Sequence, residues 1–377
     1  MTTDTRAAPD VAAPAPERRV RIRRVSREGA LTIGGAAAGA VALTWLLYER
    51  ILAASGALGF WLTWYVLFLV MYAAMAALQW DARAVRDKLA SVAFGTGAVF
   101  VCVVVFLQIG YVAARGIRAV LHIGFFTHTM ADAGPLSPLA AGGVLHAIIG
   151  TLEMLGLATL FSVPLGIMAA IFLSEVGGFW ARPVRRLVEA MTALPDIIAG
   201  LFVLAFVVLT LGIGESGVAA AIALAVTMMP IVARGSEVVL RIVPRSLREA
   251  SYALGGSQWR TVWNVVLPTA RPGLATAVVL AMARGAGETA PVLLTAGYIK
   301  GLNANPLHGW QTSLVTYIFN EHMLPDPNDQ IRTFGAGFTL IVLVLILFGI
   351  ARWLGGTRPG ELRRRDRRRI AREAARR

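Results

Sequence analysis

Apolar segments about 20 residues long recur along this chain, and they limit its fold more than any other feature. A helix needs about 20 apolar residues to cross the hydrocarbon layer of a bilayer, so each segment predicts a membrane-spanning helix. The expected fold class is therefore all-α, in a polytopic membrane protein of 377 residues. The eight predicted spans are 30–48, 55–79, 90–114, 144–173, 188–211, 216–240, 271–297 and 334–354.

The composition agrees with a membrane protein and argues against other classes. Hydrophobic residues make up 56% of the chain and charged residues 15%, which is unusual for a soluble domain. Much of the net charge of +14 comes from arginines in the two tails and in short loops, a pattern that encodes topology. Nucleic-acid binding would need a basic surface interleaved with aromatic side chains, so we expect no nucleic-acid partner. With Cys102 as the single cysteine and no metal-ligand cluster, we expect neither a disulfide nor a metal site.

Lysine is almost absent, and this bears on ATP. The two lysines are Lys88 and Lys300, and neither follows a GxxxxG pattern. A phosphate-binding loop of the Walker type needs that lysine. We therefore expect no enzyme activity and no cofactor in this chain, and any ATP with its magnesium ion should be bound by a partner ATPase.

The distribution of arginine sets the expected orientation. With the N-terminus in the cytoplasm, an even number of spans places both basic tails and the more basic loops inside, as the positive-inside rule requires. Residues 1–29 then form a disordered basic cytoplasmic tail, and 355–377 form a second basic tail. A cleaved signal peptide is the alternative reading of 30–48, but this apolar run is long for that role and no small-x-small site follows it.

Two longer segments, 115–143 and 298–333, should lie on the outer side. The second contains the aromatic run GWQTSLVTYIF. This run either lies at the membrane interface or serves as an amphipathic connector.

The apolar pattern is interrupted by a short polar motif, RSLREASYALGGSQWRTVWNVVLP, at 245–268. Ser246 with Glu249 three residues later predicts a helix that begins with a capping box. Gly255 should end that helix in the left-handed conformation, and Ser257 should cap a second helix that ends near Pro268. Several apolar side chains of the motif then need a covering surface, either the cytoplasmic ends of the spans or a partner protein; they are Tyr252, Leu254, Trp259, Val262 and Trp263.

The same motif resembles the EAA–G–I–LP loop of ABC importer permeases. The matching residues are Glu249-Ala250-Ser251, then Gly255 after three residues, then Val265-x-Leu267-Pro268 after nine more. In that family the loop is the coupling helix, seated in a groove of the ATPase subunit. The resemblance implies a coupling role for Glu249, Ala250, Gly255, Leu267 and Pro268. The alternative for Glu249 is a helix cap and nothing more.

Charged residues in two later spans indicate an anion path. Arg284 and Glu288 lie deep in the span 271–297, four residues apart, so they share a helix face and can pair. A charge at that depth is costly unless it is paired or faces a cavity. Arg234, near the inner end of the preceding span, could add to the positive field, since guanidinium donates two parallel hydrogen bonds to an oxyanion. The alternatives are a structural ion pair at Arg284 and a headgroup contact at Arg234.

The stretch RGAGETAPVLLTAG, which contains Arg284 and Glu288, resembles the PstA-type subunit of phosphate ABC importers. GGVLHAIIGTL, ALPDIIAGLF and PIVARGSEVVLRIVP agree with it. The resemblance covers about 90–354 and implies the six-helix type I importer (MetI-like) core, to which 30–89 adds two extra N-terminal transmembrane helices. It implies a phosphate-import permease of the bacterial inner membrane, with a substrate path that includes Arg284, Glu288, Arg234 and Thr289.

The resemblance also implies partners. These are a PstC-like permease subunit, a dimer of a PstB-like ATPase, a PstS-like periplasmic phosphate-binding protein and the lipid bilayer. Two acids depart from the pattern, Asp196, where the family tends to have serine, and Glu153, within the span 144–173. They either oppose an anion or pair with arginines of the sister subunit. A permease for another oxyanion or small nutrient, a secondary transporter, and a membrane sensor or scaffold are the competing interpretations.

Overall fold

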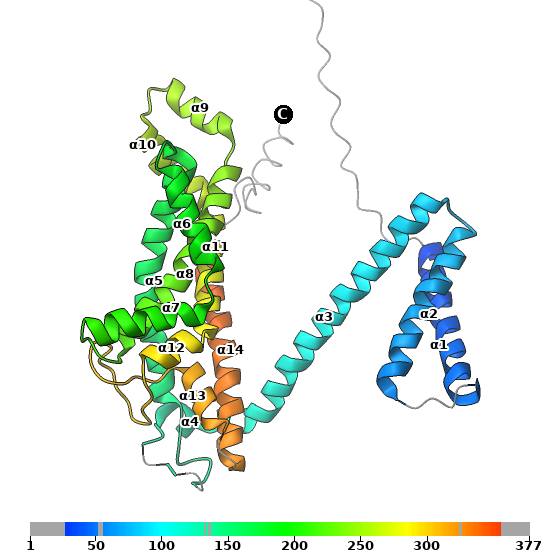
Figure 1. The fold of residues 1–377 in the computed structure, drawn as a ribbon, viewed down its shortest axis with the longest axis horizontal. Coiled ribbons are helices and arrows are strands. Elements are labelled where there is room, and N and C mark those ends of the chain that lie inside the picture. Colours follow the sequence, from blue (N-terminus) through cyan, green and yellow to red (C-terminus); the bar gives the residue numbers. More distant parts are fainter. Residues whose placement is uncertain (1–26, 52–55, 132, 135–136, 324–325, 356–377) are drawn as a thin grey trace, which may run out of the picture. The chain divides into compact units, whose positions relative to one another are not determined.

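The structure, a computed structural model, describes residues 27–51, 56–131, 133–134, 137–323 and 326–355 (Figure 1). Within these ranges every regular element is a helix, as predicted. The chain forms two compact units, which divide between Phe106 and Leu107, inside helix α3 (Ala82–Val120). Apart from their inner ends, the basic tails predicted at 1–29 and 355–377 lie outside the described residues.

The first unit contains the predicted N-terminal helix pair. Helix α1 (Arg27–Leu46) continues into a π-helical turn, η1 (Leu47–Ile51), and α2 (Ala57–Ala77) packs against it. Small and large side chains alternate at the contact, where Ala36 and Ala40 of α1 meet Phe68 and Tyr72 of α2. The two helices confirm the spans predicted at 30–48 and 55–79.

The second unit is built around four long helices; three of them confirm predicted spans, and α11 (Leu267–Gly287) lies at the predicted span 271–297 with other bounds. They are α5 (Leu145–Ile171) with its π-helical end η2 (Phe172–Val176), α8 (Gly217–Ile242), α11 and α14 (Pro327–Gly355). Helix α8 packs on both α5 and α11, and α11 packs on α14.

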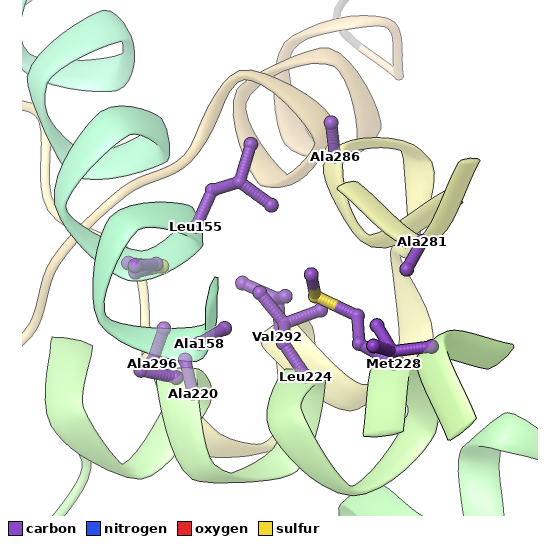
Figure 2. Packing of buried hydrophobic residues seen from close by; sticks show 12 residues of the cluster. Leu155, Ala158, Ala220, Leu224, Met228, Ala281, Ala286, Val292 and Ala296 are labelled. Carbon is purple, nitrogen blue, oxygen red and sulfur yellow. The ribbon is translucent and has the colours of Figure 1, made fainter. Parts of the chain in front are cut away.

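Small side chains allow these helices to approach closely. Figure 2 shows Leu155 of α5, Met228 of α8 and Ala281 of α11 within one buried cluster. Five further alanines belong to the cluster, namely Ala158, Ala220, Ala221, Ala286 and Ala296. In a bilayer the lipid tails are as apolar as the helices, so close van der Waals contact rather than exclusion of water holds such spans together.

The prediction of one straight helix at 188–211 is wrong. The structure has α6 (Ala181–Ala193), then α7 (Asp196–Val203) extended by η3 (Leu204–Thr210), and the two parts are bent by 102°. Pro195 causes the break, because it lacks an N–H and forces the preceding Leu194 into an extended conformation (φ −70°, ψ 130°). The described residues thus contain seven helices able to cross a membrane, or eight if the bent pair is one span.

The boundary predicted near Pro268 is also wrong. Helices α10 (Gln258–Thr261), η4 (Val262–Val266) and α11 form one continuous helix, Gln258–Gly287. In η4 the N–H of Leu267 donates to the carbonyl of Val262, five residues back. A π-helical turn of this kind lets a helix adjust its hydrogen bonds next to a proline.

The predicted span 271–297 ends early as well. Helix α11 stops at Gly287, Glu288 is extended (φ −72°, ψ 122°), and a short helix, α12 (Ala290–Thr295), follows. Pro291 in the first turn of α12 fits a helix that starts anew, because the first N–H groups of a helix have no intrahelical partner.

One end of the second unit carries the short helices α4 (Ile123–Thr127) and α13 (Leu314–Glu321), and α9 (Arg245–Ala253) lies at the opposite end (Figure 1). Helix α13 contains much of the run GWQTSLVTYIF. Leu314 and Tyr317 are fully buried, and α13 packs against α14 and α5. This packing agrees with the amphipathic connector, and the alternative at the membrane interface stays a prediction.

Candidate functional site

Two arginines predicted from the sequence each contact one arm of the bent helix pair. Arg284 of α11 binds Asp196, the first residue of α7, and Arg234 of α8 binds Glu189 of α6. Each arginine also contacts a carboxylate on its own stretch of chain. Each guanidinium therefore has two carboxylate partners, one of which depends on the bend at Pro195.

The Arg284 site lies where α11 ends. Arg284 Nη2 donates to Asp196 Oδ2 at 2.6 Å, and Arg284 Nε donates to Glu288 Oε1 at 3.1 Å. The pairing predicted from the four-residue spacing is therefore present, although Glu288 lies just beyond the helix and not within it. The Arg284 side chain remains 54% exposed, whereas Asp196 is 27% and Glu288 16% exposed. The cation is thus open to an incoming anion, and its acidic partners are more enclosed.

The Arg234 site is part of a larger ionic network. Arg234 Nη2 donates to Glu189 Oε1 at 2.7 Å, and its Nη1 lies 3.6 Å from Glu237 Oε2. Glu237 is 5% exposed and also accepts from Arg185 at 3.0 Å and Arg241 at 2.6 Å. A buried carboxylate needs such partners, because removing it from water is costly.

Arg234 lies in α8 and Arg284 in α11, and the two arginines lie at different positions along the axis of α8. Gly285, next to Arg284, lies so close to Met228 that a Cβ at this position would be 2.6 Å from its Sδ. Met228 precedes Arg234 by six residues, which is about 9 Å along a helix. The structure therefore gives two successive cationic positions and does not bring Arg234 and Arg284 into one site.

The two glycines that follow Arg284, Gly285 and Gly287, differ in their packing. Gly285 makes a close helix contact, but a Cβ on Gly287 would have no atom within 4 Å. Thr289, the last predicted path residue, is half-buried beside Glu288 and precedes α12.

The two acids that depart from the family pattern have partners within this chain. Asp196 binds Arg284, and Glu153 accepts a hydrogen bond from Gln311 Nε2. The prediction that they pair with the sister subunit is not needed to explain either of them. No signal in the sequence indicated the role of Glu189, because its contact with Arg234 spans 45 residues and depends on the bend.

The polar motif at 245–268 forms a helix, a turn and a second helix, with one correction. Helix α9 begins at Arg245, directly after Pro244, and no side chain caps it, so the predicted capping box of Ser246 and Glu249 is absent. Pro244 occupies the N-cap position and has no side-chain acceptor to offer, and Ser246 lies inside the helix as its second residue. Gly255 (φ +79°) ends the helix as predicted, and Ser257 caps the second helix by accepting the N–H of Arg260.

Most of the apolar side chains of this motif lack cover. Leu254 is 90% exposed and Trp259 60%, and Tyr252 and Trp263 are exposed as well. Val262, by contrast, is buried in a cluster with the ends of α5 and α8. Four of the five residues expected to need a covering surface thus remain exposed in this chain, and the ends of the spans cover only Val262.

Comparisons with known proteins agree with this architecture. Residues 162–356 match the family described as binding-protein-dependent transport system inner membrane component. Phosphate transport system permease protein PstA 1 of Mycobacterium tuberculosis (strain CDC 1551 / Oshkosh) is 40% identical over 263 residues, covering 70% of this chain and 86% of that protein. PstA of Haemophilus influenzae (strain ATCC 51907 / DSM 11121 / KW20 / Rd) is 35% identical over 261 residues, covering 67% and 86%.

A solved structure of the MetNI methionine ABC transporter in an inward-facing conformation is 24% identical in sequence. It covers 56% of this chain and 92% of its own, with a TM-score of 0.44. The family match spans more than half of this chain, and the sequence relatives align along most of their own length. The chain therefore belongs to the binding-protein-dependent transport system inner membrane components and, within them, to the PstA-type permeases.

Proposed function

We propose that this chain is a transmembrane permease subunit of an ATP-driven importer for inorganic phosphate. The observation that carries the proposal is the half-exposed guanidinium of Arg284, held by Asp196 and Glu288 in a family whose similar members are phosphate transport permeases. Arginine suits phosphate because its planar fork donates two parallel hydrogen bonds to an oxyanion.

Phosphate would replace the carboxylates on this guanidinium. Asp196 and Glu288 occupy Nη2 and Nε, which form one edge of the fork. An oxyanion that binds this edge makes the same two bonds, so the guanidinium of Arg284 stays paired. The displaced Asp196 and Glu288 lose their cation and compete with the substrate for it. Thr289 would add a hydroxyl donor, and Arg234 would provide the next cationic position toward the α9 end.

The coupling function rests on α9 and its glycine turn. We place this end of the chain in the cytoplasm, where a PstB-like ATPase dimer binds ATP and magnesium and covers Leu254 and Trp259. Glu249, Ala250 and Gly255 belong to the α9 portion that meets the ATPase. Leu267 and Pro268 lie further along, in the continuous helix that carries the motion into the membrane.

The remaining partners complete the transport cycle. A PstC-like subunit forms the other half of the path, and a PstS-like protein delivers phosphate from the periplasm. Closure of the ATPase moves the coupling helices together and opens the path outward, and hydrolysis resets it. This chain performs no covalent chemistry and needs no cofactor of its own.

Phosphate uptake by the complex in vesicles, with and without ATP, tests the proposal. Arg284→Ala should lower uptake more than about tenfold, since a hydrogen bond to a charged group is worth about 1.5–3 kcal/mol, and Arg284→Lys should retain an intermediate rate. Arg182→Ala, at an exposed arginine of α6 with no ion pair among the described residues, is the matched control. Unchanged uptake by Arg284→Ala in an assembled complex would refute the site, and sulfate uptake in preference to phosphate would favour another oxyanion.

A further inference from the structure

Helix α9 is attached to the rest of the chain in an unusual way. None of its residues is buried, so apolar packing does not fix its position. Only two of its residues, Arg248 and Ser251, are partly covered. These two side chains also make its side-chain hydrogen bonds to other elements, so polar contacts determine how α9 sits on the ends of the long helices.

Arg248 contacts two long helices at once. Its Nη2 and Nε donate to Glu175 of η2, at the end of α5, at 2.6 and 3.1 Å. Its Nη1 donates to the carbonyl of Val243 at 2.7 Å, and Nη2 also donates to the carbonyl of Leu240 at 3.0 Å, both at the end of α8. One guanidinium therefore joins α9 to α5 and to α8.

Burial makes this contact stiff. The Arg248 side chain is 17% exposed and that of Glu175 6%. A forked arginine–carboxylate pair that is largely removed from water has a defined geometry. Arg248 cannot leave without losing four hydrogen bonds, and Glu175 cannot leave without losing two. The carbonyls at the end of α8 add to it, because the C-terminal end of a helix attracts cations. Arg245, three residues earlier on α9, is exposed and has no ion-pair partner among the described residues.

The second arm of the motif converges on the same place. Gln258 Nε2 donates to the carbonyl of Glu175 at 2.5 Å. Ser251 Oγ and Thr261 Oγ1 lie 2.8 Å apart and join α9 to α10. The end of α5 is thus bound by residues from both sides of the glycine turn.

We propose that Arg248 is the positioning residue that transmits movement of α9 to α5 and α8, through its bonds to Glu175, Leu240 and Val243. This inference rests on the proposed coupling function of α9. The exposed apolar residues of the motif hold the ATPase, and the Arg248 contact passes the displacement to the helices that form the core of the second unit. Loss of the Arg248 contact should uncouple ATP hydrolysis from transport without releasing the ATPase.

The test uses the full complex in vesicles and measures three quantities: ATPase co-purification, ATP hydrolysis and phosphate uptake. Arg248→Ala should keep the ATPase bound and hydrolysing, while the phosphate transported per ATP falls about tenfold or more, as expected for a buried pair that has lost one partner. Glu175→Gln should lower the same ratio, and Arg248→Lys should restore part of it. Arg245→Ala, with the same charge change on the same helix, should leave the ratio unchanged.

A covalent link provides a second measurement. In a Cys102→Ser background, the double variant Arg248→Cys and Glu175→Cys should regain coupling when a bifunctional, reducible thiol reagent joins the two side chains. Reduction of the reagent should abolish coupling again. The spectrum of a spin label on Leu152→Cys in α5 should change when ATP is trapped in the otherwise unsubstituted complex. It should not change when Arg248→Ala is also present.

The outcomes separate this inference from the proposed function. Absence of phosphate uptake by the unsubstituted complex would refute phosphate as the substrate. The spin-label measurement would still test the role of Arg248, because it needs no substrate. A normal transport ratio or a normal spin-label response in Arg248→Ala would overturn the inference. Loss of the ATPase from that variant would also overturn it, because Arg248 would then serve docking.

Discussion

The role inferred for Asp196 from the sequence differs from the contact that it makes in the structure. From the sequence, it is an acid near an expected anion path that either opposes the anion or pairs with an arginine of the sister subunit. In the structure it lies 2.6 Å from Arg284 and takes up one of the donors that phosphate would use. It therefore offsets the charge of the guanidinium, and in the proposed function the substrate would have to compete with it.

Removing this carboxylate should strengthen anion binding. Asp196→Asn should raise the affinity of the purified complex, without the binding protein, for phosphate by about fivefold, because an exposed ion pair contributes up to about 1 kcal/mol. Equilibrium binding of labelled phosphate measures the change. Asp87→Asn in α3 is the control, and equal or weaker affinity in Asp196→Asn would show that Asp196 supports the site in another way.

The residues of the site were predictable to different degrees. Arg284 and Glu288 could be paired from the sequence because they are four apart, and their contact survives even though the helix ends between them. Glu189 could not be found, because its partner lies 45 residues away and the contact requires a bend that apolar periodicity does not reveal. Local spacing thus carries information that long-range ion pairs lack.

Among the helices, prolines account for the main errors of sequence interpretation. Pro195 breaks a predicted span, whereas Pro268 lies inside a continuous helix that was expected to end there. The difference comes from what precedes each proline. Leu194 becomes extended before Pro195, while a π-helical turn precedes Pro268. Composition gives the number and approximate place of the spans, but not how hydrogen bonds rearrange near a proline.

The glycine turn between α9 and α10 should be sensitive to side-chain shape. Gly255 has φ +79°, a conformation that costs a β-branched residue about 1–2 kcal/mol. Gly255→Val should therefore release the ATPase from the membrane complex or raise hydrolysis without transport, as co-purification and ATPase assays would show. Gly255→Asn should behave almost normally, since asparagine tolerates this conformation. Normal docking and coupling in Gly255→Val would contradict the prediction.

The whole molecule combines two units that differ in how they relate to the family. The match to the transport family begins at residue 162, within the second unit. This unit also contains the Arg284 site and the polar motif at 245–268, called the coupling motif below for its proposed role. The first unit has its own small core around Phe68 and Tyr72. The N-terminal helix pair was predictable from hydropathy alone, because two long apolar runs separated by a short connection leave few other folds.

The arginines predict the orientation of the whole chain, and this prediction can be tested directly. Leu254→Cys, in a Cys102→Ser background, should resist a membrane-impermeant thiol reagent in intact cells and react after permeabilisation, because the positive-inside rule places the coupling motif in the cytoplasm. A cysteine replacing Leu307, which is 56% exposed in the segment after α12, should give the opposite result. Labelling of position 254 in intact cells would reverse the orientation and remove the basis for ATPase coupling.

The uncovered tip of the coupling motif also has a consequence for biogenesis. Leu254 and Trp259 are exposed in this chain, so under the proposed function they would offer apolar surface to water for as long as no ATPase is bound. A copy synthesised in excess of its partners would carry that surface as a mark of incomplete assembly, available to chaperones and membrane proteases. Subunit stoichiometry could then be enforced after translation, by degradation of the orphan copies.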